Sequence, residues 1–233
     1  MPKSNFSVSE YSAYHLPFYG VITFIIFNLI AMWIYPGGTY QNSELETYMF
    51  TQNYFSDLGR TMTMNNTQNF YSAFVFNLSL TMIGLLMSLF YFYLPNLFRE
   101  NSTAHNIAKI ASIIAVSSGI AFAGVGITPS DLYLDEHMFF VKWAFRSFLI
   151  VAILFIVAIY QAPEWENRYA LIYFGFAIVL FGYILIMEFG PNGKDTMEGL
   201  IFQAVAQKII VLAFVVSVYF KSEGAKEVYY KIK

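Results

Sequence analysis

Three basic side chains, Lys142, Arg146 and Lys208, stand inside long apolar stretches of the sequence. A charged side chain at the centre of a transmembrane helix costs about 2.5–3.5 kcal/mol, so each of the three should face a partner in the protein or a wet cavity. Lysine and arginine bind carboxylates and phosphates, and arginine does so through paired hydrogen bonds. The three residues therefore indicate an anion site, provided that the fold brings them together.

Several other polar residues lie at a similar depth in the apolar stretches. Lys142 and Arg146 are four residues apart and so share one face of a helix. With a rise of about 1.5 Å per residue, Arg146 and Lys208 each lie about 12 Å below the outer boundary, where Glu188 is placed. This arrangement predicts a polar chamber that opens outward, with the cations as anion contacts and Glu188 as their counter-charge. The predicted ligand-binding residues also include three amides: Asn77, Gln203 and Gln207.

Two other interpretations of the same residues stay open. In the first, the charges form a structural network: Glu188 pairs with Lys208, Arg146 binds loop carbonyls, and Lys142 extends to the outer interface. In the second, they conduct ions or protons, although a channel needs a continuous polar path and the inner halves of the helices are nearly all apolar.

A second group of residues suited to chemistry lies in the outward-facing segments. His137, Asp131 and Asp57 could act as the acid–base or metal-binding group of a membrane enzyme that works on lipids. The other two histidines, His15 and His105, fall on the opposite side, which excludes a three-histidine zinc site. The sequence has no cysteine, no Gly-x-Ser-x-Gly motif and no nucleotide-binding glycine pattern. We therefore expect no metal and no cofactor, and the enzyme is kept as the alternative to a non-catalytic function.

Six apolar runs can position these residues, since a hydrocarbon layer of roughly 30 Å needs about 20 helical residues. Of the 233 residues, 58% are apolar and 12% are charged, which excludes a soluble globular protein. We predict an all-α integral membrane protein with a single transmembrane domain, a six-helix bundle with an outer loop at 36–69. The predicted helices span 16–35, 70–93, 107–128, 138–160, 169–188 and 200–220.

Basic residues near the helix ends predict the orientation, because Lys and Arg are retained in cytoplasmic loops. Eight lie on the side of the termini and two on the other side, so both termini are predicted to be cytoplasmic. The protein itself is predicted to lie in the plasma membrane. The formal net charge of −2 leaves no basic excess for nucleic acid. The expected partners are membrane lipids, with a membrane-protein partner or a second copy of the chain. The eight residues are Lys3, Arg99, Lys109, Arg168, Lys221, Lys226, Lys231 and Lys233; the two are Arg60 and Lys194.

Motifs at the outer helix ends resemble an uncharacterised family of membrane proteins. Ser56-Asp57-Leu58-Gly59 precedes a helix that contains Phe76-Asn77, and Gly126-Ile127-Thr128-Pro129-Ser130-Asp131 is followed by His137. This pattern, across about 53–155, resembles the family called domain of unknown function 998, and the DRAM, Frag and Sfk group of six-span proteins is the second candidate. The resemblance implies a six-helix bundle and no established reaction.

The leading prediction is a non-catalytic function. The outward-facing chamber would recognise a lipid headgroup or a small anion, or the protein would support a membrane assembly. The membrane enzyme built on His137, Asp131 and Asp57 is the alternative.

Overall fold

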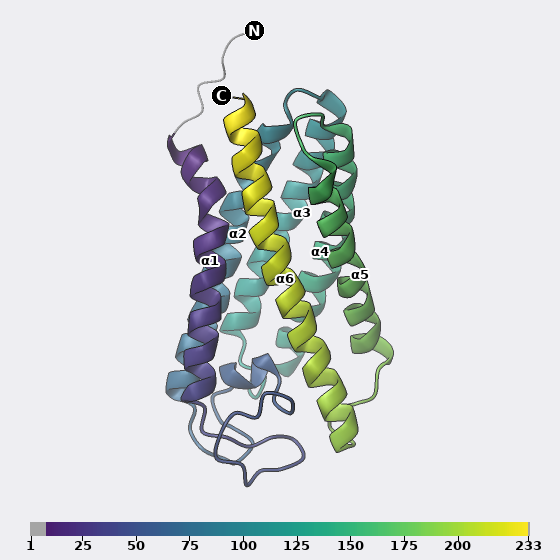
Figure 1. The fold of residues 1–233 in the computed structure, drawn as a ribbon. Helices are drawn as coiled ribbons and strands as arrows, with labels where there is room; N and C mark the ends of the chain where they lie inside the picture. Colours follow the sequence, from purple (N-terminus) through teal and green to yellow (C-terminus); the bar gives the residue numbers. More distant parts are fainter. Residues whose placement is uncertain (1–7, 233) are drawn as a thin grey trace.

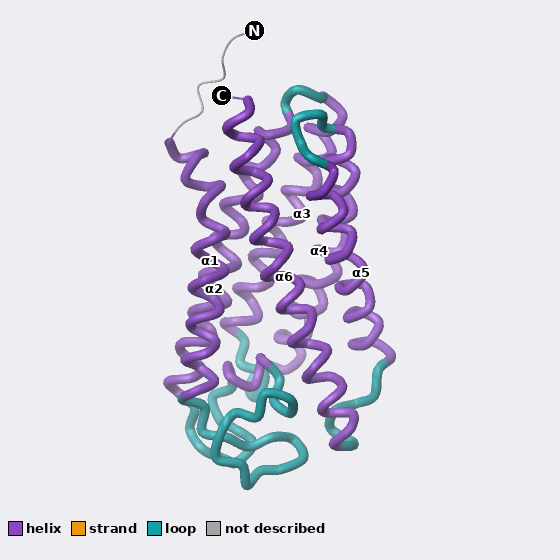
Figure 2. Tube along the Cα trace, in the orientation of Figure 1, coloured by secondary structure: helices purple, strands orange, loops and turns teal. Residues whose placement is uncertain are grey.

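The structure, a computed structural model, describes residues 8–232, with side chains from Tyr14 onward. In this range the chain forms six α-helices and two short 3-10 helices and contains no β-strand (Figures 1 and 2), which confirms the predicted all-α class. Lys3 and Lys233, used above to predict the orientation, lie outside the described residues. The helices are α1 (Val8–Trp33), η1 (Phe55–Gly59), α2 (Phe70–Tyr93), η2 (Leu94–Phe98), α3 (Ser102–Ile127), α4 (Leu134–Gln161), α5 (Asn167–Phe189) and α6 (Met197–Ile232).

All six α-helices are long and apolar enough to cross a membrane, and each contains most of one predicted run. The bounds of α2 are those predicted, 70–93. The other five helices differ at their ends and mostly extend further, because hydropathy marks only the apolar part of a helix and polar residues with good helix propensity extend it. The largest difference is in α6, which was predicted to end at residue 220 and continues to Ile232. Lys221, which was counted above among the basic residues near the helix ends, therefore lies within α6 and is buried.

Successive helices run in opposite directions, so Val8 and Ile232 lie at the same end of the bundle (Figure 1). We call this the terminal end; it also carries the connections 94–101 and 162–166. The opposite end, which we call the loop end, carries the segment 34–69 and the connections 128–133 and 190–196 (Figure 2). Helices adjacent in the sequence pack against each other, and α1 also packs against α6, which closes the bundle.

Large apolar side chains cover the outward faces of the helices. Leu29 of α1, Ile113 of α3 and Leu171 of α5 are all exposed, as are similar residues of the other three helices. An apolar surface of this extent would promote aggregation in water, whereas lipid chains solvate it. The outward faces are therefore those expected of helices surrounded by hydrocarbon.

Glycines allow α2 and α3 to approach each other closely. A Cβ atom added at Gly84 would lie 2.4 Å from the carbonyl oxygen of Gly119, and one added at Gly119 would lie 2.2 Å from Ser88 Oγ. Ser88 Oγ in turn donates a hydrogen bond of 2.8 Å to the carbonyl of Gly84. Small residues that bring two backbones together are typical of helix contacts in membranes, where apolar side chains gain little by leaving the lipid.

Replacing Gly84 should therefore destabilise the bundle. We expect Gly84→Ala to lower the free energy of unfolding by about 1–3 kcal/mol, because the added methyl group forces the two backbones apart. Gly175→Ala is the matched control, since a Cβ atom there meets no other atom within 4 Å. The measurement is the thermal midpoint of each purified variant in detergent micelles, followed by helical circular dichroism. Equal midpoints for the two variants would contradict the α2–α3 contact.

Candidate functional site

Two of the three predicted cations gather around one carboxylate on the exposed surface of α4 and α5. Arg146 Nη2 lies 2.6 Å from Glu188 Oε1, and Lys142 Nζ lies 3.7 Å from the same oxygen. Their side chains remain substantially exposed, 53% for Arg146 and 41% for Lys142. The pair thus shares a helix face, as the spacing predicted, and the cluster keeps a formal charge of +1.

The two cations also border a surface groove of about 650 Å³ between α3 and α4. Trp143 Nε1 donates a hydrogen bond of 3.0 Å to Ser117 Oγ across the groove. The part nearest the loop end therefore carries charge and hydrogen-bonding groups, and the deeper part is apolar. The groove is lined by Ile113, Ile114, Ser117, Phe139, Lys142, Trp143, Arg146, Ser147 and Ile150.

Lys208 lies in a different place from this cluster. Its side chain is buried under the segment 34–69, where Nζ donates a hydrogen bond to the carbonyl oxygen of Asn53. The rings of Tyr48, Phe50 and Phe55 surround the ammonium group at 5.5, 5.5 and 5.1 Å. The three cations are therefore divided between two environments and do not share the single chamber that the sequence predicted. The prediction rested on a common depth along the helices, and depth does not determine the direction in which a side chain points.

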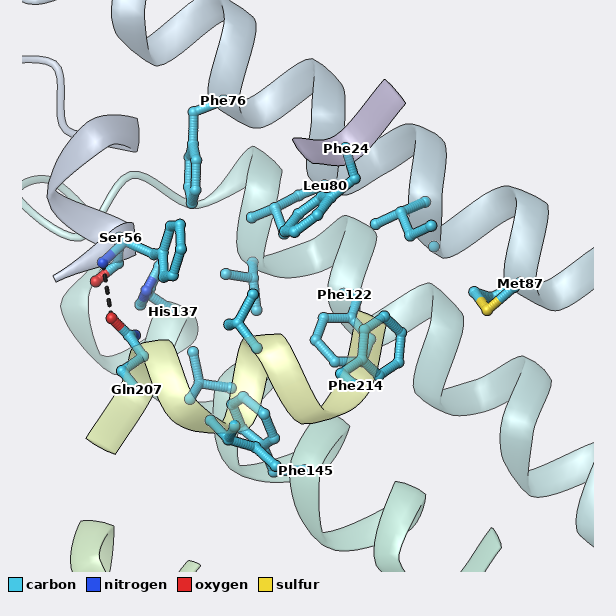
Figure 3. Close-up of a pocket in the computed structure, with 17 residues that line it drawn as sticks. Phe24, Ser56, Phe76, Leu80, Met87, Phe122, His137, Phe145, Gln207 and Phe214 are labelled. Atoms are coloured by element: carbon cyan, nitrogen blue, oxygen red, sulfur yellow. Dashed lines mark hydrogen bonds between the residues drawn. The ribbon is translucent and has the colours of Figure 1, made fainter. Parts of the chain in front are cut away.

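The predicted amides serve mainly to fasten loops and helix ends. Gln207 Oε1 accepts a hydrogen bond of 2.7 Å from the backbone N–H of Phe55, which is the dashed line in Figure 3. Gln203 Nε2 donates to the carbonyl oxygens of Ile186 and Pro191, each at 3.0 Å. Asn77 is half-buried and lies directly against η1, since a Cβ atom at Gly59 would approach its Oδ1 to 2.6 Å. The geometry gives these amides clear structural partners.

Asp57 is buried within η1, at the loop end. Its Oδ2 accepts hydrogen bonds from the backbone N–H of Tyr54 at 2.8 Å and from Asn53 Nδ2 at 3.2 Å. Burial raises the pKa of the Asp57 carboxyl above its ordinary value, although these hydrogen bonds and the charges of Arg60 and Lys208 act in the opposite direction. Asp57 thus organises η1 and the base of the segment 34–69.

Asp131 fastens the segment 34–69 to the turn before α4. Its carboxylate accepts hydrogen bonds from Thr61 Oγ1 at 2.6 Å, from the Thr61 N–H at 3.0 Å and from the Met62 N–H at 2.9 Å. Partial burial acts to raise the pKa of Asp131, but the hydrogen bonds from Thr61 and Met62 outweigh it and lower the pKa below 3.8. The contact joins residues about 70 positions apart, and it positions the start of α4.

His137 is buried beside the same turn. Its Nδ1 lies 2.7 Å from the carbonyl oxygen of Thr128 and so carries the proton, because a carbonyl can only accept. Within the described residues, no hydrogen bond or ion pair joins His137 to Asp57 or Asp131, and no three His, Asp or Glu residues gather closely enough to hold a metal ion. The catalytic group of the enzyme alternative stays a prediction, and its three members have separate structural partners.

His137 also lines a cavity of about 80 Å³ inside the bundle. Figure 3 shows that polar groups of Ser56, His137 and Gln207 lie at one end, while Met87, Phe122 and Phe214 lie towards the other. Most of the lining is apolar. The cavity is therefore suited to an apolar group and not to the anion that the sequence predicted for the interior.

Sequence reasoning missed one charged residue, Lys221. It is 2% exposed, and its Nζ has no hydrogen-bond partner among the described residues. The signal that could have found it is periodicity, since Lys221 follows the buried residues Ser217 and Val218 at helical spacing. Hydropathy could not find it, because a lysine ends an apolar run whichever way it points.

No known protein family, curated protein sequence or solved structure matches the chain. The resemblance to domain of unknown function 998 and to the DRAM, Frag and Sfk group therefore stays a prediction. The motifs that carry it do lie together at the loop end: Gly59 packs on Phe76 and Asn77, and Asp131 binds the residues that follow η1.

The Asp131 contact predicts a pH-dependent attachment of the segment 34–69. In Asp131→Asn the amides of Thr61 and Met62 should exchange hydrogen roughly tenfold faster, the effect of one charge-assisted hydrogen bond weakened by partial solvent exposure. Because the pKa of Asp131 is lowered, the attachment is complete above pH 3.8 and is lost as the pH falls further. Exchange is measured by mass spectrometry, with the exposed Asp135→Asn as control. A difference from wild type that persists unchanged well below pH 3.8 would contradict this role.

Proposed function

We propose that this protein spans a membrane six times and recognises an anionic lipid headgroup at the groove between α3 and α4. Both termini are assigned to the cytoplasm and the segment 34–69 to the outside. The observation that carries the proposal is the cluster of Lys142 and Arg146 around Glu188, beside an apolar groove on the outer face of the bundle. The proposal narrows the predicted chamber to the two cations that share one site.

The orientation follows from the positions of the basic residues. At the terminal end, Arg99, Arg168 and Lys231 lie near helix ends, and Lys109 and Lys226 lie further along their helices. The loop end carries Arg60 and Lys194. Because cytoplasmic segments retain Lys and Arg, the terminal end is assigned to the cytoplasm. The groove then opens towards the outer leaflet.

The charge of the cluster favours an anion. Two cations share a single carboxylate, so one positive charge remains uncompensated by protein. A guanidinium has five N–H donors, and within the described residues Glu188 is the hydrogen-bond partner of Arg146. The hydrocarbon layer offers no acceptor for the other donors, whereas a lipid phosphate offers several oxygens. Binding a phosphate would therefore satisfy the charge and the donors together.

The shape of the groove favours a lipid over a free anion. Trp143 lies about one turn and Phe139 about two turns nearer the loop end than Arg146, and their rings stack with a centroid separation of 6.4 Å. Aromatic residues of this kind gather at the headgroup level of membranes. Nearer the terminal end, Ile113 and Ile150 give the groove an apolar lining beyond the charged residues. A headgroup at Arg146 would thus have its acyl chain along α3 and α4.

Neutralising the two sides of the ion cluster should have opposite effects on lipid binding. Arg146→Gln should lower the retained phosphatidylglycerol roughly tenfold, the loss expected when one phosphate contact of about 1.4 kcal/mol is removed. Glu188→Gln should increase retention, because it removes the anion that competes for both cations. The measurement is native mass spectrometry of protein in micelles with equal amounts of phosphatidylglycerol and phosphatidylcholine.

The controls for this experiment separate a lipid site from general anion binding. Arg168→Gln removes an exposed arginine at the terminal end, which pairs with Glu166 and Glu227, and should leave retention unchanged. Inorganic phosphate added in excess should not displace the lipid, because it lacks the acyl chain that fills the groove. Equal retention of the two lipids, or wild-type retention in Arg146→Gln, would overturn the proposed function.

The orientation can be tested with single cysteines, since the natural chain has none. Ser43→Cys places a thiol on the exposed part of the segment 34–69, and Ser102→Cys places one at the exposed start of α3. In intact cells a membrane-impermeant maleimide should label only Ser43→Cys, and both variants should be labelled after permeabilisation. Labelling of Ser102→Cys alone in intact cells would reverse the assignment.

A further inference from the structure

A buried amine in the half of the bundle nearer the terminal end has no part in the lipid site. Lys221 Nζ lies 3.5 Å from the ring centroid of Phe155, 3.9 Å from that of Tyr173 and 4.6 Å from that of Tyr91. We call these three rings the aromatic cage. All three are at most 1% exposed, and the described residues offer Nζ neither a carboxylate nor a hydrogen bond. A lysine held in this way is unusual, because a buried charge is normally paired.

This enclosure has the features of a nucleophilic amine. A lysine desolvated in an apolar pocket is suited to forming an imine with a carbonyl compound. An imine becomes a cation when its nitrogen takes up a proton, and three aromatic faces within 5 Å would stabilise that charge. The desolvation favours the neutral, reacting amine, and the aromatic faces favour the protonated imine that it forms.

The cage also contains a proton donor. Tyr91 and Tyr173 share one hydrogen bond, with their hydroxyl oxygens 3.1 Å apart. One hydroxyl donates to the other, so the second hydroxyl retains a proton that this bond does not use. Such a proton can be transferred to an oxygen that leaves as water.

The apolar cavity provides a place for the carbonyl compound. Met87 lines the cavity and is one turn from Tyr91 in α2, and Phe214 lines it two turns before Lys221 in α6. A lysine side chain leans towards the start of its helix, which for Lys221 is towards the cavity. Phe148 contacts both Phe214 and Tyr91, with centroid separations of 5.6 and 5.9 Å. A layer of rings thus separates the cavity from the amine.

We propose that Lys221 forms an imine with an apolar aldehyde that enters from the cavity lined by Met87 and Phe214. The amine lone pair attacks the carbonyl carbon, a C–N bond forms as the C=O π bond opens, and one nitrogen proton passes to the oxygen to give a carbinolamine. A hydroxyl of the Tyr91–Tyr173 pair protonates this oxygen, the C–O bond breaks, and water leaves as the nitrogen lone pair forms the C=N bond. The second nitrogen proton then returns to the tyrosine pair. Aldehyde and amine give imine and water, so the step needs no oxidant or reductant.

The test uses the full-length protein in detergent micelles with nonanal and cyanoborohydride, which fixes an imine as a stable secondary amine. Peptide mass spectrometry should find the nonyl group on Lys221 roughly tenfold more often than on any exposed lysine, since exposed lysines are almost entirely protonated at neutral pH. Lys221→Arg should lose this adduct, because a guanidinium does not form it. Lys208→Arg, a change at the other buried lysine, should keep it.

The mapping on the wild-type protein keeps the test decisive even if Lys221→Arg fails to fold. No adduct at Lys221, or equal labelling of Lys221 and the exposed lysines, would overturn the proposal. Neither result bears on the lipid groove, which lies on the outer face of α3 and α4.

Discussion

The cost of placing a charged side chain among apolar helices governs where each cation of this bundle lies. Lys208 offsets it with a backbone carbonyl and three rings at the loop end, whereas Lys221 has no hydrogen bond and is enclosed only by the aromatic cage. Lys142 and Arg146 satisfy it only in part, through one shared carboxylate. Lys208 and Lys221 are enclosed by protein, and we interpret their environments as a structural and a reactive site. The cluster of Lys142 and Arg146 is exposed and is suited to a ligand.

The loop end determines the geometry of the open site. Asp131 ties the segment 34–69 to the turn before α4, and η1 packs against α2 through Gly59. These contacts fix where α4 begins and therefore where Lys142 and Arg146 stand along its length. Further along α4 towards the terminal end, the hydrogen bond between Trp143 and Ser117 holds α4 to α3 beside the groove. The polar loop contacts thus support the site without taking part in it.

Much of this arrangement could be predicted from the sequence, because it depends on length and spacing. Runs of about 20 apolar residues predicted six helices, and the four-residue spacing of Lys142 and Arg146 predicted their common face. The partner of Lys208 could not be predicted, because it is the backbone of a loop far away in the sequence. Lys221 was misplaced for a related reason: hydropathy records that a residue is charged, whereas burial depends on which side of the helix packs against the bundle.

The most direct test of the account is an experimental structure of the protein in lipid nanodiscs that contain phosphatidylglycerol. We predict density for a headgroup in the groove between α3 and α4, with a phosphate oxygen about 3 Å from a guanidinium nitrogen of Arg146 and an acyl chain along Ile113 and Ile150. A groove filled only by acyl chains, with Arg146 and Lys142 both closed on Glu188, would contradict the account.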